Sequence, residues 1–412
     1  MPNTFAYTSN WVTMRTLDLL VNKLEVGAFF NTEFNRELTQ EFPVGSTFNV
    51  KLPQMFIPRT GLGYNPQTIN RRTTPVTCDQ VIGVDFEWDS IELALNMERG
   101  EEEIEKQYLM PAAAALKQEL DSKCAQWAYL NSPNIVGSLG TNPTSFQTID
   151  QAREQLVEMG CPPGGDKGLL IPPAISVALS NAGVTYFNPT GNISQQYKEG
   201  SLGRTKGFDV YESMSLYDHT AGTWAGAVTV TGAGQSGSTL NVTATTGDTF
   251  LAGDIISIAN VFPTNPMTRR TTQRANAKTF VITQNTTAAA NAAALPIYPA
   301  IVGPGSPYQN VNALPAAGAA LTLFPGTVTP NGRTGKQGLA MHANAFALVS
   351  VKFQNPKAVE IASQTRDPKT GVSIAFVRAF DAVQRKWINR FDMMIGFGNL
   401  YAENCSVRVL GA

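Results

Sequence analysis

The most regular apolar pattern in the chain lies between residues 101 and 131 and has the period of an α-helix. Apolar residues recur at about every fourth position, and acidic residues crowd the first turns, where carboxylates favour the positive helix end. Gly100 precedes the stretch and Asn131-Ser132-Pro133 ends it. We therefore expect a long spine helix whose apolar face includes Ile104, Tyr108, Leu116, Leu120 and Trp127.

Pro111 disturbs this spine helix. A proline inside a helix removes one backbone hydrogen bond and usually kinks the helix. The sequence leaves two alternatives open, a bend at Pro111 or a helix that restarts with Pro111 at its first position. At about 1.5 Å per residue the stretch makes a rod of roughly 46 Å, which suits an extended subunit.

Two further patterns precede the spine. Residues 9–25 are amphipathic and predict a helix with Trp11 and Leu17 on its apolar side. From Thr47 the period falls to two, and a second alternating run follows at residues 84–88. The stretch between these runs is polar and rich in Arg, Thr and Pro. We expect a long two-stranded arm with an irregular tip, whose basic residues include Arg59, Arg71 and Arg72.

Downstream of the spine, helical and strand patterns alternate, which is typical of an α+β fold. The spacing predicts a helix from Thr144 or Ser145 to about residue 160, a strand at 168–172, a short helix at 175–181 and a strand at 208–211.

At about Gly222 the pattern changes, and small and β-branched residues with frequent turn signals continue to about Ala340. This change predicts a separate β-rich domain inserted at residues 223–340. Its candidate strands are 227–231, 240–244, 255–258, 279–283, 297–302 and 320–324. The insert splits the parent domain, where helical and long-strand patterns return at 345–353, 372–380, 387–395 and 407–410.

Composition and charge restrict the class of protein. Lys plus Arg total 31 and Asp plus Glu total 32, so no global field draws the chain to nucleic acid or to an anionic membrane. Only 15% of the residues are charged, which suits a surface used by neighbouring copies. The sequence shows neither a signal-peptide pattern nor a window of 18 apolar residues, so we expect a soluble protein. Scattered spacing predicts free thiols for Cys78, Cys124, Cys161 and Cys405.

Candidate chemistry is sparse. A lone GxGxxG pattern begins at Gly232, but a strand follows it instead of a helix, so we expect a hairpin turn. His219 and His342 lie far apart, on predicted loops, and indicate neither a zinc site nor a catalytic triad. The acidic run 101–105 would suit a cation, but the first turns of a helix are the simpler explanation. We predict that the protein is not an enzyme and holds no cofactor or metal.

Two basic clusters each leave two interpretations open. Arg71 and Arg72 either neutralise phosphate or carboxylate groups on a partner or belong to a solvated loop. The insert carries six basic and two acidic residues, a local formal charge of +4. This excess either attracts an acidic patch on a neighbouring subunit or is a solvated surface. The predicted basic patch consists of Arg269, Arg270, Arg274 and Lys278.

The order of these parts resembles the major capsid protein of tailed bacteriophages, which has the Hong Kong 97 fold. A helix, a long β arm, a spine helix, an α+β body and a late β insert follow one another along nearly the whole chain. The likeness is greatest to the coat protein family of short-tailed phages with an extra inserted domain. Local stretches that carry it are IELALNM at 91–97, GSLGR at 200–204, GFDVY at 207–211, AGDIISI at 252–258 and 396–411, which begins with GFG.

This resemblance implies six parts along the chain. They are an N-terminal helical arm at 1–44, an extended β loop at 45–95, a peripheral domain with the spine at 96–145, the first part of an axial domain at 146–222, an inserted β-barrel-like domain at 223–340 and C-terminal axial and peripheral strands at 341–412. The extended loop would overlap a neighbouring subunit. The expected inter-subunit contacts are Arg59, Arg71, Arg72, Trp11 and Leu17.

The resemblance also implies a function. Copies of the chain would form the hexamers and pentamers of an icosahedral shell that encloses double-stranded DNA, assembled in the host cytoplasm. Scaffolding protein, portal and weakly held packaged DNA are the implied partners, with no membrane. An encapsulin-like nanocompartment shell shares this fold and is one alternative. A nucleotide-binding enzyme that uses the Gly232 loop is the other.

Overall fold

A computed structural model describes the chain in two compact units, Met1–Lys51 with Thr73–Cys124 and Phe346–Gly398, and Leu52–Arg72 with Ala125–Ala345 and Asn399–Ala412. Each unit is described by itself. The described residues are 9–21, 24–33, 47–64, 66–69, 72–89, 108–137, 140–162, 167–183, 203–272, 277–323, 334–353, 361–367, 371–383 and 386–411.

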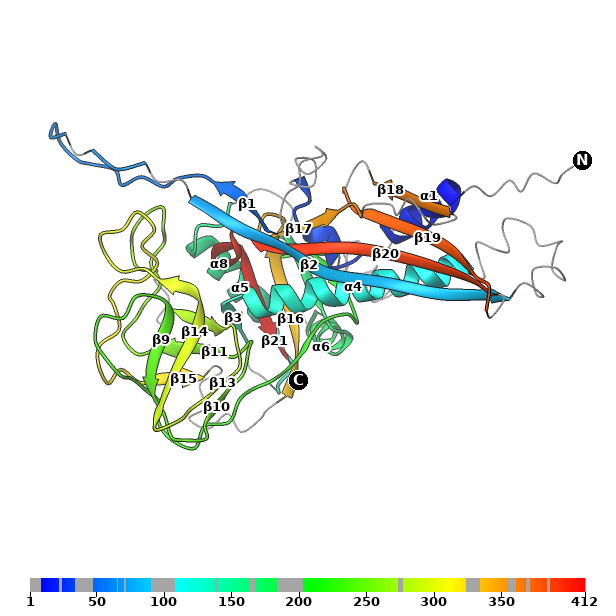
Figure 1. Cartoon of the computed structure of the whole chain (residues 1–412). Helices are drawn as coiled ribbons and strands as arrows, with labels where there is room; N and C mark the ends of the chain where they lie inside the picture. Colours follow the sequence, from blue (N-terminus) through cyan, green and yellow to red (C-terminus); the bar gives the residue numbers. More distant parts are fainter. Residues whose placement is uncertain are drawn as a thin grey trace, which may run out of the picture. The chain divides into compact units, whose positions relative to one another are not determined.

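The first unit is built on a sheet with the strand order β1-β2-β20-β19-β18, in which β17 also pairs with β20. The two long strands β2 and β20 run antiparallel, from Thr77 opposite Phe397 to Asp89 opposite Lys386 (Figure 1). Solvent exposure alternates along β2, as its alternating sequence predicts. The strands are β1 (Thr47–Leu52), β2 (Arg72–Asp89), β17 (Phe346–Val351), β18 (Ile361–Arg366), β19 (Ser373–Asp381) and β20 (Lys386–Asn399).

The N-terminal segment packs on this sheet. Helix α1 (Ser9–Val21) contacts β18 and β19, and it is shorter than the predicted 9–25. A 3₁₀ turn, η1 (Gly27–Phe29), follows, and the Phe30 ring then stacks on Phe346 with ring centres 5.4 Å apart.

The spine helix α4 (Met110–Asn131) is preceded by a π-helical turn at residues 108–109. Pro111 is the second residue of α4, directly after the π-helical turn. Residues 90–107 lie outside the described part of the chain, so the choice between a bend and a restart stays open. Leu116 and Leu120 are buried, as predicted. Ile104 lies outside the described residues. Residues up to Cys124 belong to the first unit and the rest of α4 belongs to the second.

A buried carboxylate attaches the spine to the N-terminal segment. Asp121 accepts hydrogen bonds from the backbone N–H groups of Gly27 (2.9 Å) and Glu25 (3.2 Å). Lys117 lies 3.5 Å from Asp121 and 2.5 Å from Glu25. Burial raises the pKa of Asp121, and the two backbone donors and Lys117 act against this rise.

The body of the second unit is a mixed sheet with the order β3-β21-β16-β4-β6-β5, in which β7 pairs with β16. The pairs β21–β3 and β4–β6 are parallel. The predicted helix and strand patterns of this half are confirmed. The strands are β3 (Asn134–Val136), β4 (Lys167–Ile171), β5 (Arg204–Thr205), β6 (Phe208–Glu212), β7 (Asp218–Thr220), β16 (Thr334–His342) and β21 (Ser406–Leu410), and the helices are α5 (Gln147–Glu158), α6 (Pro173–Gly183) and α8 (Ala402–Cys405).

Between β7 and β16 lies the insert, whose sheet has the order β15-β11-β12-β14-β9-β8. A bridge between Thr229 and Ala320 brings the first strand to the last, so the sheet is a nearly closed barrel. Its core is its own and includes Trp224, Phe250 and Phe280. The strands are β8 (Thr229–Val230), β9 (Gly237–Thr243), β11 (Ile255–Ile258), β12 (Thr279–Ile282), β14 (Ala292–Ile301) and β15 (Leu321–Leu323), with the separate pair β10 (Thr249–Phe250) and β13 (Thr286–Thr287).

The insert agrees closely with its predicted pattern. Each of the six predicted strand segments overlaps a strand of the barrel. The pair β10–β13 was not predicted, because two residues are too short to show a period of two. The described chain as a whole is of the mixed α+β class, as expected.

Candidate functional site

Three features of the described chain concern function: the tip of the arm, a basic loop of the insert, and the polar contacts that attach the insert to the body of the second unit. Among the described residues, no group of three or more His, Cys, Asp or Glu side chains could hold a metal ion. No helix in the described part of the chain is long and apolar enough to cross a membrane.

The described residues of the arm tip, 53–64 and 66–69, present large apolar side chains to solvent. The two sides of the tip are joined by the Gln67 amide, which donates to the Ile57 carbonyl (2.6 Å) and accepts from the Ile57 N–H (2.8 Å). Exposed apolar side chains gathered on one segment are typical of a surface that another protein covers. Four of them are 58% to 101% exposed: Phe56, Leu62, Tyr64 and Ile69.

The predicted arm arginines lie in different surroundings. Arg59 is exposed and donates a hydrogen bond to the Gly61 carbonyl within the tip. Arg72 is the first residue of β2, and its guanidinium lies 5.1 Å from the centre of the Tyr308 ring. Arg72 therefore has an aromatic partner in its own subunit, and its expected contact with a neighbour stays a prediction. Arg71 lies outside the described residues.

The expected contact through Leu17 is wrong. Leu17 is buried inside the first unit, on the face of α1 that lies against β18 and β19. The apolar side of this helix covers the subunit's own sheet, so Leu17 is not available to a neighbouring subunit. Trp11 lies in α1, but its side chain is outside the described part of the structure.

Two of the four residues in the predicted basic patch lie on one loop of the insert. Arg270 is exposed, whereas Arg269 is half-buried and donates through Nη2 to the Ser306 carbonyl (2.7 Å). Asn265 closes this loop, because its backbone N–H donates to the Arg270 carbonyl (3.0 Å). Arg274 lies outside the described residues.

Lys278 does not belong to a surface patch, which corrects that part of the prediction. Its side chain is 1% exposed, and Nζ lies 2.9 Å from Glu403 Oε1 in α8 of the body. The same oxygen accepts a hydrogen bond from Asn310 Nδ2 at 3.0 Å. A buried ammonium needs a charged partner, so this cation serves the attachment of the insert and not an external surface.

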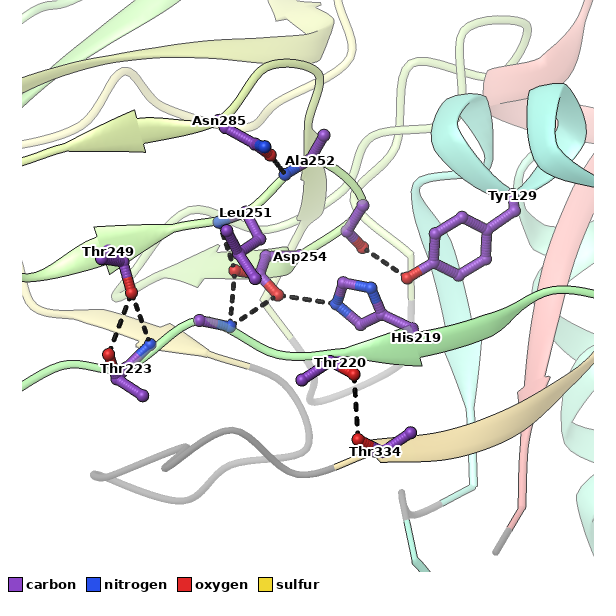
Figure 2. Close-up of polar contacts among 12 residues, drawn as sticks. Tyr129, His219, Thr220, Thr223, Thr249, Leu251, Ala252, Asp254, Asn285 and Thr334 are labelled. Carbon is purple, nitrogen blue, oxygen red and sulfur yellow. Dashed lines mark hydrogen bonds and ion pairs between the residues drawn. The ribbon is translucent and has the colours of Figure 1, made fainter.

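Asp254 is the centre of a second attachment, at the point where the chain enters the insert (Figure 2). Its buried carboxylate accepts hydrogen bonds from the backbone N–H groups of Leu251 (2.8 Å) and Gly222 (3.1 Å). His219 Nε2, in β7, lies 2.7 Å from the other carboxylate oxygen. These bonds tie the last strand before the insert to the turn that precedes β11.

The expectation that both histidines lie on loops is wrong. His219 lies in β7 and His342 is the last residue of β16, and both side chains are buried.

Gly253 connects the insert to α4 and β21. Its carbonyl accepts hydrogen bonds from Arg408 Nη1 (2.8 Å) and from the Tyr129 hydroxyl (3.4 Å), the latter drawn in Figure 2. The Arg408 guanidinium lies 4.0 Å from the centre of the Tyr129 ring, and its Nε donates to the Ser132 carbonyl (3.0 Å). Burial lowers the pKa of Arg408 and raises the pKa of Tyr129. We call the set Tyr129, His219, Gly253, Asp254, Lys278, Glu403 and Arg408 the insert junction.

The sequence analysis did not predict most of the contacts in the insert junction. A lone arginine within the apolar strand pattern 406–410 was one available signal, because an arginine in a buried strand needs partners. Asp254, one of only two acidic residues in the insert, was another. Neither signal identifies the partners, which lie more than a hundred positions from Arg408 and include His219, 35 positions from Asp254.

The glycine-rich segment is a hairpin turn, as predicted. Strands β8 and β9 pair antiparallel on either side of it. Gly234 and Gly237 have positive φ angles of 74° and 98°, which suit a tight turn. The Gln235 side chain accepts from the Asn241 N–H (2.7 Å) and fastens the turn to β9.

One protein family matches most of the chain. The sequence model of a family described as "P22 coat protein - gene protein 5" matches residues 76–411, from β2 to just beyond the end of β21. No curated protein matches the sequence.

Several solved structures are similar at low sequence identity. One from Mycobacterium phage Che8 is 12% identical, with 99% of this chain and 96% of that chain covered and a TM-score of 0.49. The capsid of the cyanophage P-SCSP1u is 14% identical, with 90% and 85% covered and a TM-score of 0.42. A virus-like particle from Pyrococcus furiosus is 8% identical, with 96% and 98% covered and a TM-score of 0.39.

Proposed function

The chain belongs to the P22 coat protein family, and from this premise we propose how its parts serve a phage shell. It is a structural protein of the virion, the major capsid protein of a tailed phage, and not an enzyme. Its copies assemble with one another into an icosahedral shell. The family match over residues 76–411 is the observation that carries this conclusion.

We infer that the elements take the parts expected of a Hong Kong 97-like subunit. The β1–β2 excursion would be the extended loop, and α4 with the sheet of the first unit would form the peripheral domain. The mixed sheet of the second unit would form most of the axial domain, and the barrel would be the inserted domain. The order of elements along the chain supports this assignment.

We propose that the arm tip covers a surface of a neighbouring copy. Its exposed apolar side chains support this, because their burial at about 25 cal/mol per Å² would favour association. Arg59 lies among them and would set the register of the contact more than its strength, as rim charges do.

We propose scaffolding protein, portal and packaged double-stranded DNA as further partners, in line with the family. The nearly balanced charge of the chain, with 31 basic and 32 acidic residues, favours weak and non-specific contacts with DNA. Hexamers and pentamers would use the same surfaces in slightly different geometries.

Assembly is the direct test of this function. The purified chain, alone and with the scaffolding protein of its own phage, should give closed shells of uniform size by electron microscopy and fast-sedimenting particles by analytical ultracentrifugation. Sedimentation of monomers alone, even with scaffolding protein and a crowding agent, would contradict the proposal.

A further inference from the structure

A small pocket with a partly polar lining lies between the insert junction and Gln337 of β16. Its volume is about 10 Å³, and its polar lining consists of His219, Asp254, Gln337 and Arg408. The other lining residues are Ile135 of β3, Ile255 of β11, Leu410 of β21, Ala221 and Gly253. The cavity lies where the strands that enter and leave the insert, β7 and β16, pair with each other.

Two polar atoms in this lining have no hydrogen-bond partner in the protein. They are Arg408 Nη2, a donor, and Gln337 Oε1, an acceptor. Both residues are buried, at 1% and 5% exposure. The other nitrogens of Arg408 are bound to the carbonyls of Ser132 and Gly253. A buried donor and a buried acceptor without partners are costly, and native proteins rarely leave them so.

The chemistry of the lining selects the ligand. A molecule that satisfies both atoms must accept a hydrogen bond from Arg408 and donate one to Gln337. An anion cannot donate to Gln337 and is repelled by the Asp254 carboxylate, while a metal cation is repelled by the guanidinium. The cavity has about the room that one water molecule needs and is too small for an organic ligand.

We propose that the insert junction binds one ordered internal water, which accepts from Arg408 Nη2 and donates to Gln337 Oε1. This water links β21 to β16, the strand by which the chain leaves the insert. Arg408 is already bound to Gly253 of the insert, so the water would complete a connection between the insert and the strand that follows it. The proposal rests on the cavity and its two atoms, and it does not depend on the proposed inter-subunit contacts.

A density map of the wild-type protein tests the proposal directly. In a map at a resolution that shows internal waters, we expect a peak about 2.7–3.2 Å from both Arg408 Nη2 and Gln337 Oε1. An empty cavity in a map that shows internal waters elsewhere would overturn the proposal. So would a direct hydrogen bond between the two side chains.

Thermal unfolding of variants gives a second test. Gln155 is a matched control, because its Oε1 is also buried without a partner, yet it does not line the cavity. We expect Gln337→Leu to lower the unfolding midpoint by about 2–4 °C more than Gln155→Leu does. In an Arg408→Met background this difference should disappear, because the water has lost its donor. An undiminished difference there would contradict the bridge. The map needs only the wild-type protein, so it decides the matter if Arg408→Met does not fold.

Discussion

Gly253 meets two independent constraints at the insert junction. Its backbone φ of +95° lies in the left-handed region, which residues other than glycine adopt only at an energetic cost. A Cβ at this position would also lie 2.4 Å from Tyr129 Cε1, closer than atoms in contact can approach. Gly247 shares the first constraint, with a φ of +96°, but nothing lies within 4 Å of its Cβ position. The two glycines therefore separate backbone strain from steric overlap.

We predict that Gly247→Ala destabilises the subunit by about 1–2 kcal/mol, from the backbone alone. Gly253→Ala should cost roughly 1–3 kcal/mol more, because the Tyr129 ring must move out of a packed site. Urea unfolding of the unassembled subunit measures both. Equal losses of unfolding free energy in the two variants would mean that the Tyr129 ring moves away without an energetic cost.

Cys78 should be almost unreactive in the folded protein at pH 8. Burial, and then the charge of Asp79, raises the pKa of its thiol to about 11. Only the thiolate is alkylated, and at pH 8 it would be about one part in a thousand. We predict that iodoacetamide labels Cys78 slowly and that the labelling rate rises about tenfold per pH unit up to pH 10. Peptide mass spectrometry measures this rate. The denatured chain is the control, and labelling of native Cys78 within minutes at pH 8 would contradict the prediction.

At the scale of elements, the apolar surface of α1 is covered within its own unit, whereas that of the arm tip is not. Leu17 and Leu20 are buried beneath α1. In the arm tip, Leu62 and Tyr64 are 101% and 88% exposed. Apolar side chains therefore stabilise a single subunit in α1. In the arm tip, we propose, they attach one subunit to another.

We predict that Leu62→Ser combined with Tyr64→Ser changes the free energy of unfolding of the subunit by at most about 0.5 kcal/mol per site, because both side chains are exposed. Shell formation should fall sharply, because the proposed contact loses its apolar area. Val383→Ser is a matched control, since Val383 is 93% exposed on a turn between β19 and β20. Sedimentation and electron microscopy score assembly. Normal shells from the double variant would show that these two side chains of the arm tip are not needed for the contact between subunits.

On the scale of the whole molecule, the insert is a domain with its own core that also packs against the body of the second unit. Its barrel closes on itself around Trp224, Phe250 and Phe280. On its outer side, Ile255 and Val281 pack with Ile135 and Leu410 of the body. Lys278 and Asp254 add polar attachments to α8 and β7. Removal of the insert would therefore expose apolar and charged groups of the body that are now buried.

We predict that residues 223–340 expressed alone form a β domain that melts cooperatively, because the core apart from Ala221 lies within the segment. The chain without them should be poorly soluble and assemble aberrantly, because Glu403 loses Lys278 and Arg408 loses the Gly253 carbonyl. Circular dichroism and electron microscopy measure the two outcomes. A disordered segment together with normal shells from the deletion variant would show that the insert is dispensable.

The sequence alone determined the elements whose pattern is local. The described part of the spine, β1, the second half of β2 and the six barrel strands are recognised because residues two, three or four positions apart share a face, and that spacing is written in the chain. The turn at Gly232 follows for the same reason, since a strand and not a helix comes after it. Even the order of parts, and with it the family resemblance, is a property of the linear sequence.

Only the tertiary structure decided which polar groups are buried and with what. Nothing local distinguishes Lys278 from Arg270, yet one is paired with Glu403 in α8 and the other faces solvent. Leu17 gave no sign that its helix covers its own sheet. The environment of a charge or an apolar face is set by segments a hundred or more residues away, and burial, with the pairing that it requires, exists only once those segments have met.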